Sequence, residues 1–338
     1  MLHTPSILIT GASGFIGSFL VEKALEEGFD TWAGIRKSSS KEYLQDKRIH
    51  FIDFNFKNKE ELTAQLFEFK KLYGKFDYII HNAGVTKCLN KKDFEKINFQ
   101  YTANFIDALI ESDCIPQKFI LMSSLSVMGN GDEKTYKPFK LDDTPNPNTA
   151  YGKSKLKAER YLQDSNNFPH LIFRPTGVYG PREKDYFLML KTVKSGLDVG
   201  AGFKTQHLTF IYVKDLVNII FSGIESYLTN KTYFVADSNV YTDKEYTNIV
   251  KRALNKKNVF SIKVPLWLLK IISFFSEQFA RLSRIPSTLN CDKYKIMKQR
   301  NWECDITPLI EDYNFRPQYD LKRGIEESLN WYKENNWI

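Results

Sequence analysis

The segment Thr10-Gly-Ala-Ser-Gly-Phe-Ile-Gly17 constrains the fold of this chain more than any other feature. An apolar run, Ile7–Thr10, precedes its three glycines, and an amphipathic pattern, Gly17–Glu27, follows them. Glycines at this spacing permit a tight turn from a strand into a helix and a close approach of a ligand to the backbone. The N-terminus of the helix then faces the ligand and favours negative charge there. The context predicts an α/β fold that begins with a turn for the pyrophosphate of a dinucleotide.

Short apolar runs alternate with amphipathic helical patterns through the first half of the chain. This alternation is typical of parallel strands joined by crossover helices. Because helices cover both faces of such a sheet, the run Phe119-Ile-Leu-Met122 can be continuously apolar. The pattern predicts a Rossmann-type doubly wound parallel sheet. We expect strands at Ile7–Thr10, Thr31–Ile35, Ile49–Asp53, Asp77–His81, Lys118–Met122 and His170–Phe173, and a helix at Lys59–Tyr73 among those that join them.

The rhythm changes after Arg174, where prolines and glycines separate shorter segments. Phe210–Val213 has the pattern of a strand that returns to the sheet, and Asp215–Glu225 has the pattern of a helix. We therefore expect residues 1–173, with a return segment of about 209–237, to form the dinucleotide-binding domain. Residues 174–208 and 238–338 are expected to form a smaller C-terminal substrate-binding lobe of helices and loops.

The composition is that of an ordinary globular protein, with 26% charged and 42% hydrophobic residues among 338. The net charge is +8, but the lysines are spread along the chain without a compact basic tract, so no nucleic-acid partner is predicted. Its four cysteines show no paired spacing and no histidine at zinc spacing. We expect no metal site and a reduced, cytoplasmic protein without a signal peptide.

One apolar stretch, residues 264–282, invites a comparison with membrane segments. Lys270, Glu277 and Arg281 interrupt it, and a spanning helix needs about 20 mainly apolar residues, so no membrane span is predicted. Pro265 suits the first turn of a helix. We expect a buried or cap-forming helix here, with a surface-bound amphipathic helix as the alternative.

The residues after the second expected strand bear on the choice of cofactor. An acid at this strand end accepts a hydrogen bond from the ribose 2′-hydroxyl of NAD, whereas a basic residue accommodates the 2′-phosphate of NADP. Here the strand is followed by Arg36-Lys-Ser38, with no acid at its tip. Arg36 can pair with a phosphate and Ser38 can donate a hydrogen bond to it, which favours NADP over NAD. The alternative is that Arg36 stacks on the adenine and distinguishes neither cofactor.

Tyr151 and Lys155 lie four residues apart, on one face of an expected helix. A free phenol has a pKa of about 10, and a nearby ammonium lowers that value, which makes Tyr151 a candidate proton donor and acceptor. Ser124 follows the strand Lys118–Met122, at the edge of the sheet where ligands bind. This serine can hold a substrate oxygen beside Tyr151. A tyrosine–lysine pair alone is common by chance, so the hypothesis depends on all these motifs together.

In these motifs the chain resembles the extended short-chain dehydrogenases/reductases, the NAD-dependent epimerase/dehydratase family. The likeness covers most of the chain, and the motifs occur in the family's order. Besides the glycine segment they are His81-Asn-Ala-Gly84, Ile97-Asn98, Ser123-Ser124, Tyr151-x-x-x-Lys155, Arg174-Pro175, Tyr179-Gly-Pro-Arg182 and Phe210-Ile-Tyr-Val-Lys-Asp215.

The resemblance implies a role for each matching position. Ser124 takes the place of the catalytic Ser/Thr, Tyr151 is the general acid/base, and Lys155 binds the nicotinamide ribose and lowers the pKa of Tyr151. Asn98 lies behind the active site. Either Asn55-Phe56 or Asp53-Phe54 meets the adenine, and the spacing to Leu62 favours the former. The cofactor-binding set comprises Gly11, Ser13, Gly14, Phe15, Ile16, Gly17, Arg36, Ser38, Asn55, Phe56, Asn82, Ala83, Gly84, Asn98 and Pro175.

Departures from the family pattern narrow the activity. The dehydratase branch has Asp and Glu directly after the catalytic Ser/Thr, where this chain has Leu125 and Ser126, so dehydration is disfavoured. Nucleotide-sugar members often have an arginine seven residues before Asp215, where this chain has Leu208. The segment from Arg174 to Arg182 also resembles the hydroxysteroid-dehydrogenase and flavonol-reductase branch. The apolar segment Leu266–Leu282 could then cap a less polar substrate.

We therefore expect an NAD(P)-dependent oxidoreductase that transfers hydride at a secondary alcohol or ketone carbon. A nucleotide-sugar epimerase with tightly bound, transiently reduced cofactor is an alternative, because it uses the same three side chains. A non-catalytic dinucleotide-sensing protein is a second alternative, from a different class. Apolar residues on two sides of the expected helix Lys91–Ser112 predict a homodimer formed through this helix and the one that bears Tyr151; the alternative is that loops cover the second side within one chain.

Overall fold

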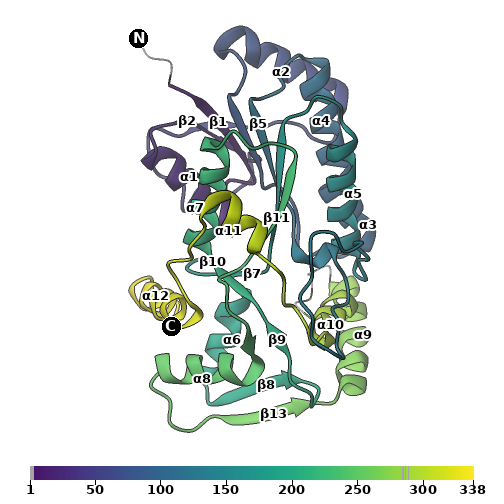
Figure 1. Ribbon diagram of the computed structural model, residues 1–338, viewed down its shortest axis with the longest axis vertical. Coiled ribbons are helices and arrows are strands. Elements are labelled where there is room, and N and C mark those ends of the chain that lie inside the picture. Colours follow the sequence, from purple (N-terminus) through teal and green to yellow (C-terminus); the bar gives the residue numbers. More distant parts are fainter. Residues whose placement is uncertain (1–3, 284, 286, 288) are drawn as a thin grey trace.

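The computed structural model describes residues 4–283, 285, 287 and 289–338. Within this part of the chain, the central sheet has seven strands in the order β11-β6-β5-β4-β1-β2-β3, and every neighbouring pair is parallel (Figure 1). The predicted doubly wound sheet is confirmed. Its strands are β1 (Ser6–Thr10), β2 (Asp30–Gly34), β3 (His50–Ile52), β4 (Tyr78–His81), β5 (Lys118–Met122), β6 (His170–Pro175) and β11 (Lys231–Val235).

Helices cover both faces of the sheet (Figure 1). Successive residues of β1 illustrate why, because Ile7 and Ile9 enter the core on one face and Leu8 enters the core on the other, all fully buried. On the first face lie α1 (Phe15–Glu26), α7 (Val213–Glu225) and α11 (Thr307–Tyr313); on the second lie α2 (Lys59–Tyr73), α4 (Tyr101–Glu111) and α5 (Ala150–Asp164).

The order of the strands reverses next to β1. The chain adds β2 and β3 on one side of β1 and then crosses to place β4 on the other side. Ligands of open α/β sheets bind beyond the carboxyl ends of the strands at such a reversal. The fold therefore directs attention to the loops that follow β1 and β4.

The remaining elements gather mostly below the carboxyl edge of the sheet (Figure 1). Three small sheets pair β7 (Gly177–Tyr179) with β10 (Phe210–Tyr212), β8 (Leu197–Ala201) with β13 (Phe260–Val264), and β9 (His207–Leu208) with β12 (Tyr241–Thr242). The helices there are α6 (Asp185–Lys194), α8 (Asp243–Ala253), α9 (Leu266–Ser283), α10 (Cys291–Lys298) and α12 (Leu321–Glu334).

The prediction that Phe210–Val213 returns to the main sheet is wrong. This segment forms β10, which pairs with β7 in a separate sheet, and β11 is the strand that returns to lie beside β6. The side chains of Phe210 and Tyr212 pack instead into an aromatic core that includes Tyr179 and Tyr246. Apolar pattern predicted a strand correctly, but it did not distinguish the two sheets.

The expected helix Lys91–Ser112 consists of α3 (Lys91–Phe94), the π-helical segment η1 (Glu95–Gln100) and α4. Its two apolar sides are not both free, because Phe105 and Ile106 are both fully buried, while Ile110 is exposed. Contacts of η1 with α5 and of α4 with α2 cover much of the second side. The chain itself therefore accounts for much of the pattern from which a dimer was predicted.

Residues 266–283 form the expected helix, α9, but its expected burial is wrong. Only one side of α9 packs on the protein, through Leu269, Ser273, Glu277 and Ala280, and most of its large apolar side chains are exposed. Among the described residues, no helix is long and apolar enough to cross a membrane.

Candidate active site

The turn after β1 requires glycine at several positions. Gly11 has a φ of +66°, and a Cβ added to it would lie 2.9 Å from the backbone of Ala83 in the loop after β4. A Cβ on Gly17 would lie 2.2 Å from the carbonyl oxygen of Gly11. The backbone N–H of Gly11 donates to the carbonyl of Gly34 at the end of β2, at 3.1 Å. The glycines thus let three strand ends meet at one point.

The start of α1 is suited to an anion. Gly14 precedes the helix, no side chain of the described residues caps it, and its first turn contains no acid. The first N–H groups of a helix have no partner within the helix, and they favour negative charge. Gly14 is exposed, and Ser13, Phe15 and Ile16 are partly exposed. These residues fit the pyrophosphate of a dinucleotide.

Thr10 joins the ends of β1 and β4. Its hydroxyl accepts a hydrogen bond from the backbone N–H of Ala83 at 3.1 Å and forms another with Nδ1 of His81 at 2.9 Å. The other ring nitrogen of His81 pairs with the hydroxyl of Thr102 at 3.0 Å. Burial lowers the pKa of His81 to about 3, so the ring is neutral at pH 7. This bonded group holds Asn82, Ala83 and Gly84 beside the glycine turn.

Asn98 fixes the continuation of that loop. Its side chain accepts from the backbone N–H of Val85 at 2.8 Å and donates to the carbonyl of Val85 at 3.0 Å and to the hydroxyl of Ser154 at 3.1 Å. Asn98 lies in η1 and is buried. It therefore links the loop after β4 to α5, which carries Tyr151 and Lys155.

Lys155 reaches the same strand ends from α5. Its Nζ donates to the carbonyl of Met122, the last residue of β5, at 2.7 Å. A Cβ placed on Gly84 would lie 3.3 Å from this Nζ, which locates the amine beside the loop after β4.

Tyr151 and Ser124 come together at the end of β5. Thr149 caps α5 by accepting a hydrogen bond from the N–H of Gly152 at 3.0 Å, which places Tyr151 in the first turn. Ser124 begins a short 3₁₀ turn, η2 (Leu125–Val127), and its hydroxyl lies near enough to Tyr151 to affect the pKa of that phenol. The structure thus gathers the three residues that the sequence predicted as catalytic.

The electrostatics of this group differ from the expectation. Burial raises the pKa of Tyr151 to about 12, and the nearby hydroxyl of Ser124 opposes that shift. Burial also lowers the pKa of Lys155 to about 8. Among the described residues, Lys155 does not lower the pKa of Tyr151, because its ammonium is directed to the carbonyl of Met122. That part of the prediction is wrong for the chain by itself, which keeps Tyr151 protonated.

Arg36 and Ser38 are exposed and follow the end of β2. Asp53, which directly follows β3, reaches the same loop, because its carboxylate accepts from the backbone N–H of Lys37 at 3.0 Å. Pro175 ends β6 and pairs with Val235 of β11. All follow or end strands at the carboxyl edge of the sheet; β2 and β3 are neighbours, whereas β6 lies on the other side of β1.

Asn55 and Phe56 lie in the turn that joins β3 to α2. The side-chain amide of Asn55 donates to Glu61 at 2.7 Å and accepts from the backbone N–H of Lys57 at 3.2 Å. Phe56 packs against Phe105 and against His81, the last residue of β4, so this turn also lies at the carboxyl edge of the sheet. The choice between Asn55-Phe56 and Asp53-Phe54 for the adenine contact stays a prediction.

Two contacts that the sequence did not indicate hold α5 in place. Arg174 of β6 forms a buried ion pair with Glu159, with nitrogen–oxygen distances of 3.0 and 2.7 Å. Asp292 of α10 accepts from the backbone N–H of Ala150, next to Tyr151, at 2.7 Å. Because these partners are 15 and 142 residues apart, no local motif could pair them.

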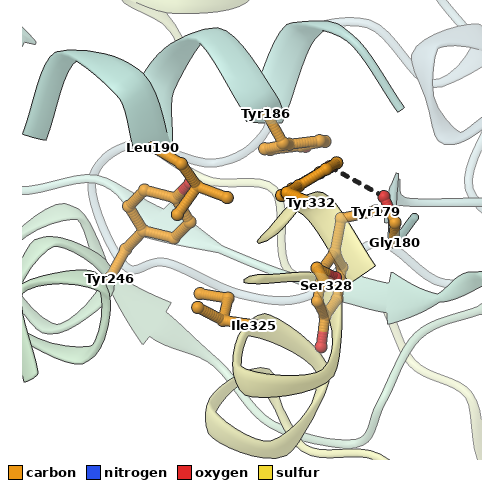
Figure 2. A pocket seen from close by; sticks show the side chains of 8 residues that line it. All are labelled: Tyr179, Gly180, Tyr186, Leu190, Tyr246, Ile325, Ser328 and Tyr332. Atoms are coloured by element: carbon orange, nitrogen blue, oxygen red, sulfur yellow. Dashed lines mark hydrogen bonds between the residues drawn. The ribbon is translucent and has the colours of Figure 1, made fainter. Parts of the chain in front are cut away.

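The structure also shows the surroundings of Leu125 and Leu208, the two positions where this chain departs from the family pattern. Leu125 is buried, and Leu208 is half-buried against the aromatic core of the lobe, so neither supplies a charge to the site. A separate cavity of about 10 Å³ lies between α6 and α12 (Figure 2). Its lining includes Tyr186 and Tyr332, and the hydroxyl of Tyr332 donates to the carbonyl of Gly180 at 2.9 Å. This space suits at most one water molecule and is not a substrate site.

The family model described as "NAD dependent epimerase/dehydratase family" matches residues 7–236. The chain is 25% identical over 345 residues to a UDP-glucose 4-epimerase of Vibrio cholerae, covering 98% of this chain and 96% of that protein. It is 22% identical over 358 residues to the dTDP-D-glucose 4,6-dehydratase of Homo sapiens, covering 98% and 91%.

A solved structure of the Bordetella bronchiseptica enzyme WbmG, in complex with NAD and UDP, has the same fold. It superposes with a TM-score of 0.76 at 18% identity and covers 98% of this chain and 96% of that one. At 18% identity, this similarity supports the fold alone.

Proposed function

The chain belongs to the NAD dependent epimerase/dehydratase family, and from this premise we propose that it is an NAD(P)-dependent oxidoreductase acting at a secondary alcohol or ketone carbon. One observation carries the proposal. Ser124 and Tyr151 lie near each other at the carboxyl edge of the sheet, and Lys155 reaches the same edge. A substrate oxygen placed there would meet two hydroxyl groups, beside a turn suited to a dinucleotide.

The side chains divide the proton chemistry among them. When bound, the nicotinamide supplies or accepts the hydride. In the reductive direction Tyr151 donates its phenolic proton to the carbonyl oxygen while Ser124 donates a hydrogen bond to the same oxygen. The raised pKa of Tyr151 keeps this proton in place at neutral pH. In the oxidative direction the phenol must lose it, and Lys155, if turned from Met122 toward the ribose, favours that loss.

We propose NADP(H) as the preferred cofactor. Arg36 and Ser38 are exposed beyond β2, where a 2′-phosphate would be recognised. Asn55 and Phe56 are our candidates for the adenine contact, with Asp53 and Phe54 as the alternative. Gly11, Gly14, Gly17, Asn82, Ala83 and Gly84 would line the pyrophosphate and adenosine side, and Pro175 would lie beyond β6.

Mass spectrometry of the purified protein and a spectrophotometric assay test this function together. Cofactor released by acid identifies NAD or NADP. The protein is then incubated with NADPH and a panel of ketones, and with UDP-glucose. Oxidation of NADPH with one equivalent of alcohol formed supports net reduction, and absence of turnover on every carbonyl and nucleotide sugar in the panel contradicts it.

A nucleotide-sugar epimerase is the second candidate, favoured by the similarity to the Vibrio cholerae epimerase along nearly the whole chain. It predicts cofactor retained through purification and a changed sugar without net change in cofactor absorbance. Leu125 and Ser126 argue against dehydration, because neither side chain can remove a proton as a carboxylate does. The gathered Ser124, Tyr151 and Lys155 argue against a pure sensor.

We propose the same two-domain organisation that the sequence indicated. Residues 1–173 with 209–237 would bind the cofactor, and residues 174–208 and 238–338 would bind the substrate. The four cysteines are free, in keeping with a cytoplasmic location. A homodimer through η1, α4 and α5 remains a proposal, which light scattering of the wild type and of an Ile110→Lys variant would test.

A further inference from the structure

Helix α9 presents a broad apolar face to solvent. Large apolar side chains that are 42–83% exposed make up this face: Trp267, Ile271, Ile272, Phe274, Phe275, Phe279 and Leu282. At 100° per residue, these positions span an arc of about 160° opposite the buried side of the helix. We call these seven residues the α9 face. Monomeric proteins rarely expose so continuous a patch without a partner for it.

The strands that lead into α9 extend this surface. In the paired strands β8 and β13, Leu197 lies opposite Phe260 and Val199 lies opposite Ile262, and all four side chains are exposed. Phe203, in the loop after β8, is 75% exposed. β13 continues through Pro265 into α9, at the end of the molecule farthest from α2 (Figure 1).

The positive charge of the chain is concentrated in the same segment. Residues 251–300 contain 12 Lys and Arg and 2 Asp and Glu, a net charge of +10, whereas the whole chain carries +8. The even spread expected from the sequence therefore does not hold when charge is counted by segment. Both acids are buried, Glu277 against Arg281 at 2.9 Å and Asp292 beside Lys295 at 3.8 Å. Exposed Lys256, Lys257, Lys270 and Arg281 accompany the apolar residues.

We propose that the α9 face binds the surface of an anionic lipid bilayer. An amphipathic helix with aromatic and aliphatic residues on one side and basic residues around it lies in the plane of the headgroups. The basic side chains would meet anionic headgroups, while the apolar residues enter the acyl boundary. This interaction is independent of the proposed oxidoreductase activity.

Two other roles for the α9 face, a dimer interface and a cap over the substrate, fit the charge and the exposure of its side chains less well. In a two-fold dimer the same patch meets itself, and two segments of +10 would then face each other. A cap over an apolar substrate would turn these side chains toward the site, whereas they are exposed and the inward side of α9 offers Ser273 and Glu277. A bilayer alone is complementary to both the apolar residues and the charge.

Flotation of the whole protein with phosphatidylcholine vesicles, with and without phosphatidylglycerol, tests the proposal. We expect binding to the anionic vesicles that weakens at high salt. The variant F275S/F279S should bind about tenfold less or weaker still. Its matched control is F67S/L72S, which removes two exposed apolar side chains from α2 and should bind as the wild type does. Equal binding by both variants would overturn the proposal.

Two further measurements separate folding and dimerisation from lipid binding. Brominated lipids should quench the fluorescence of Trp267, and Trp267→Phe should remove most of that quenching; quenching that persists in the variant contradicts insertion of α9. The variant K256E/K257E should bind anionic vesicles several-fold less without a change in thermal unfolding. If instead F275S/F279S converts a dimer to a monomer and the wild type does not bind vesicles, the α9 face is a protein interface and the proposal fails.

Discussion

The carboxyl edge of the sheet and the α9 face differ in which side chains they bury: the first buries polar groups, and the second exposes apolar ones. At the sheet edge, polar groups such as Thr10, His81 and Asn98 are buried and each has a hydrogen-bond partner within the chain. On the α9 face, large apolar side chains are exposed, although the described residues form four buried apolar clusters elsewhere. The polar groups of the first region are held by bonds within the chain, whereas the apolar groups of the second have no cover from it.

The variant Tyr151→Phe is the sharpest way to test this contrast. It removes the proton donor but keeps the ring that packs on Phe94. Since general acid catalysis is worth about 10²–10⁴-fold, we expect turnover to fall by that factor while cofactor affinity, measured by fluorescence titration, is nearly unchanged.

The paired variant F275S/F279S should leave turnover in solution at the wild-type level, because neither side chain lies at the sheet edge. A Tyr151→Phe protein with the wild-type rate on a true substrate would refute the assigned role. Loss of turnover in both would erase the distinction between the two regions.

The ion pair of Arg174 and Glu159 tests whether the sheet edge depends on internal bonding. Glu159 is fully buried, so Arg174→Met would leave its charge without a partner and should cost about 3–5 kcal/mol of unfolding free energy. Urea denaturation measures this loss. The double variant Arg174→Met/Glu159→Met should recover much of it, and Lys71→Met, which breaks an exposed pair with Glu68, should have no measurable effect.

His81 predicts a pH dependence for the same region. Its pKa is lowered from 6.5 to about 3 by burial, so below pH 6.5 the unfolded chain binds the proton that the folded chain excludes. Stability from this group is therefore complete above pH 6.5 and is lost as the pH falls, by up to about 1.4 kcal/mol per pH unit. The variant His81→Asn lacks this loss, so the gap in unfolding free energy between wild type and variant should narrow from pH 7 to pH 5. A gap that stays constant would show that His81 does not titrate as inferred.

Much of the sheet edge could be predicted from sequence because its constraints are local. The turn at Gly11–Gly17 has glycines where a Cβ would collide with backbone, and Tyr151 and Lys155 share a helix face through their spacing of four. Strand ends could be placed for the same reason, since continuous apolar runs mark strands buried on both faces. Local patterns therefore predicted most of the strands and helices at this edge and the proximity of Ser124 and Tyr151.

What the sequence did not predict depends on contacts between distant segments. The same apolar pattern fits a strand in the main sheet or in a small one, so β10 was assigned to the wrong sheet. The periodicity of α9 predicted its helix correctly, but the number of apolar residues says nothing about which of them the chain can cover.

The variant Arg36→Ala gives the smallest expected effect and tests the outermost part of the sheet edge. Unlike Glu159 or His81, Arg36 is exposed, so its removal should not change the free energy of unfolding. It should change only the affinity for the cofactor. If it pairs with a 2′-phosphate, the loss should be about tenfold for NADP(H) and small for NAD(H), because a charge-assisted pair is worth about 1.5–3 kcal/mol and part of it is screened by solvent. Titration with both cofactors measures the two losses, and Lys37→Ala, one position away, serves as the control for general positive charge. Equal losses for NADP(H) and NAD(H) would mean that Arg36 only stacks on the adenine, and the basis for an NADP preference would be gone.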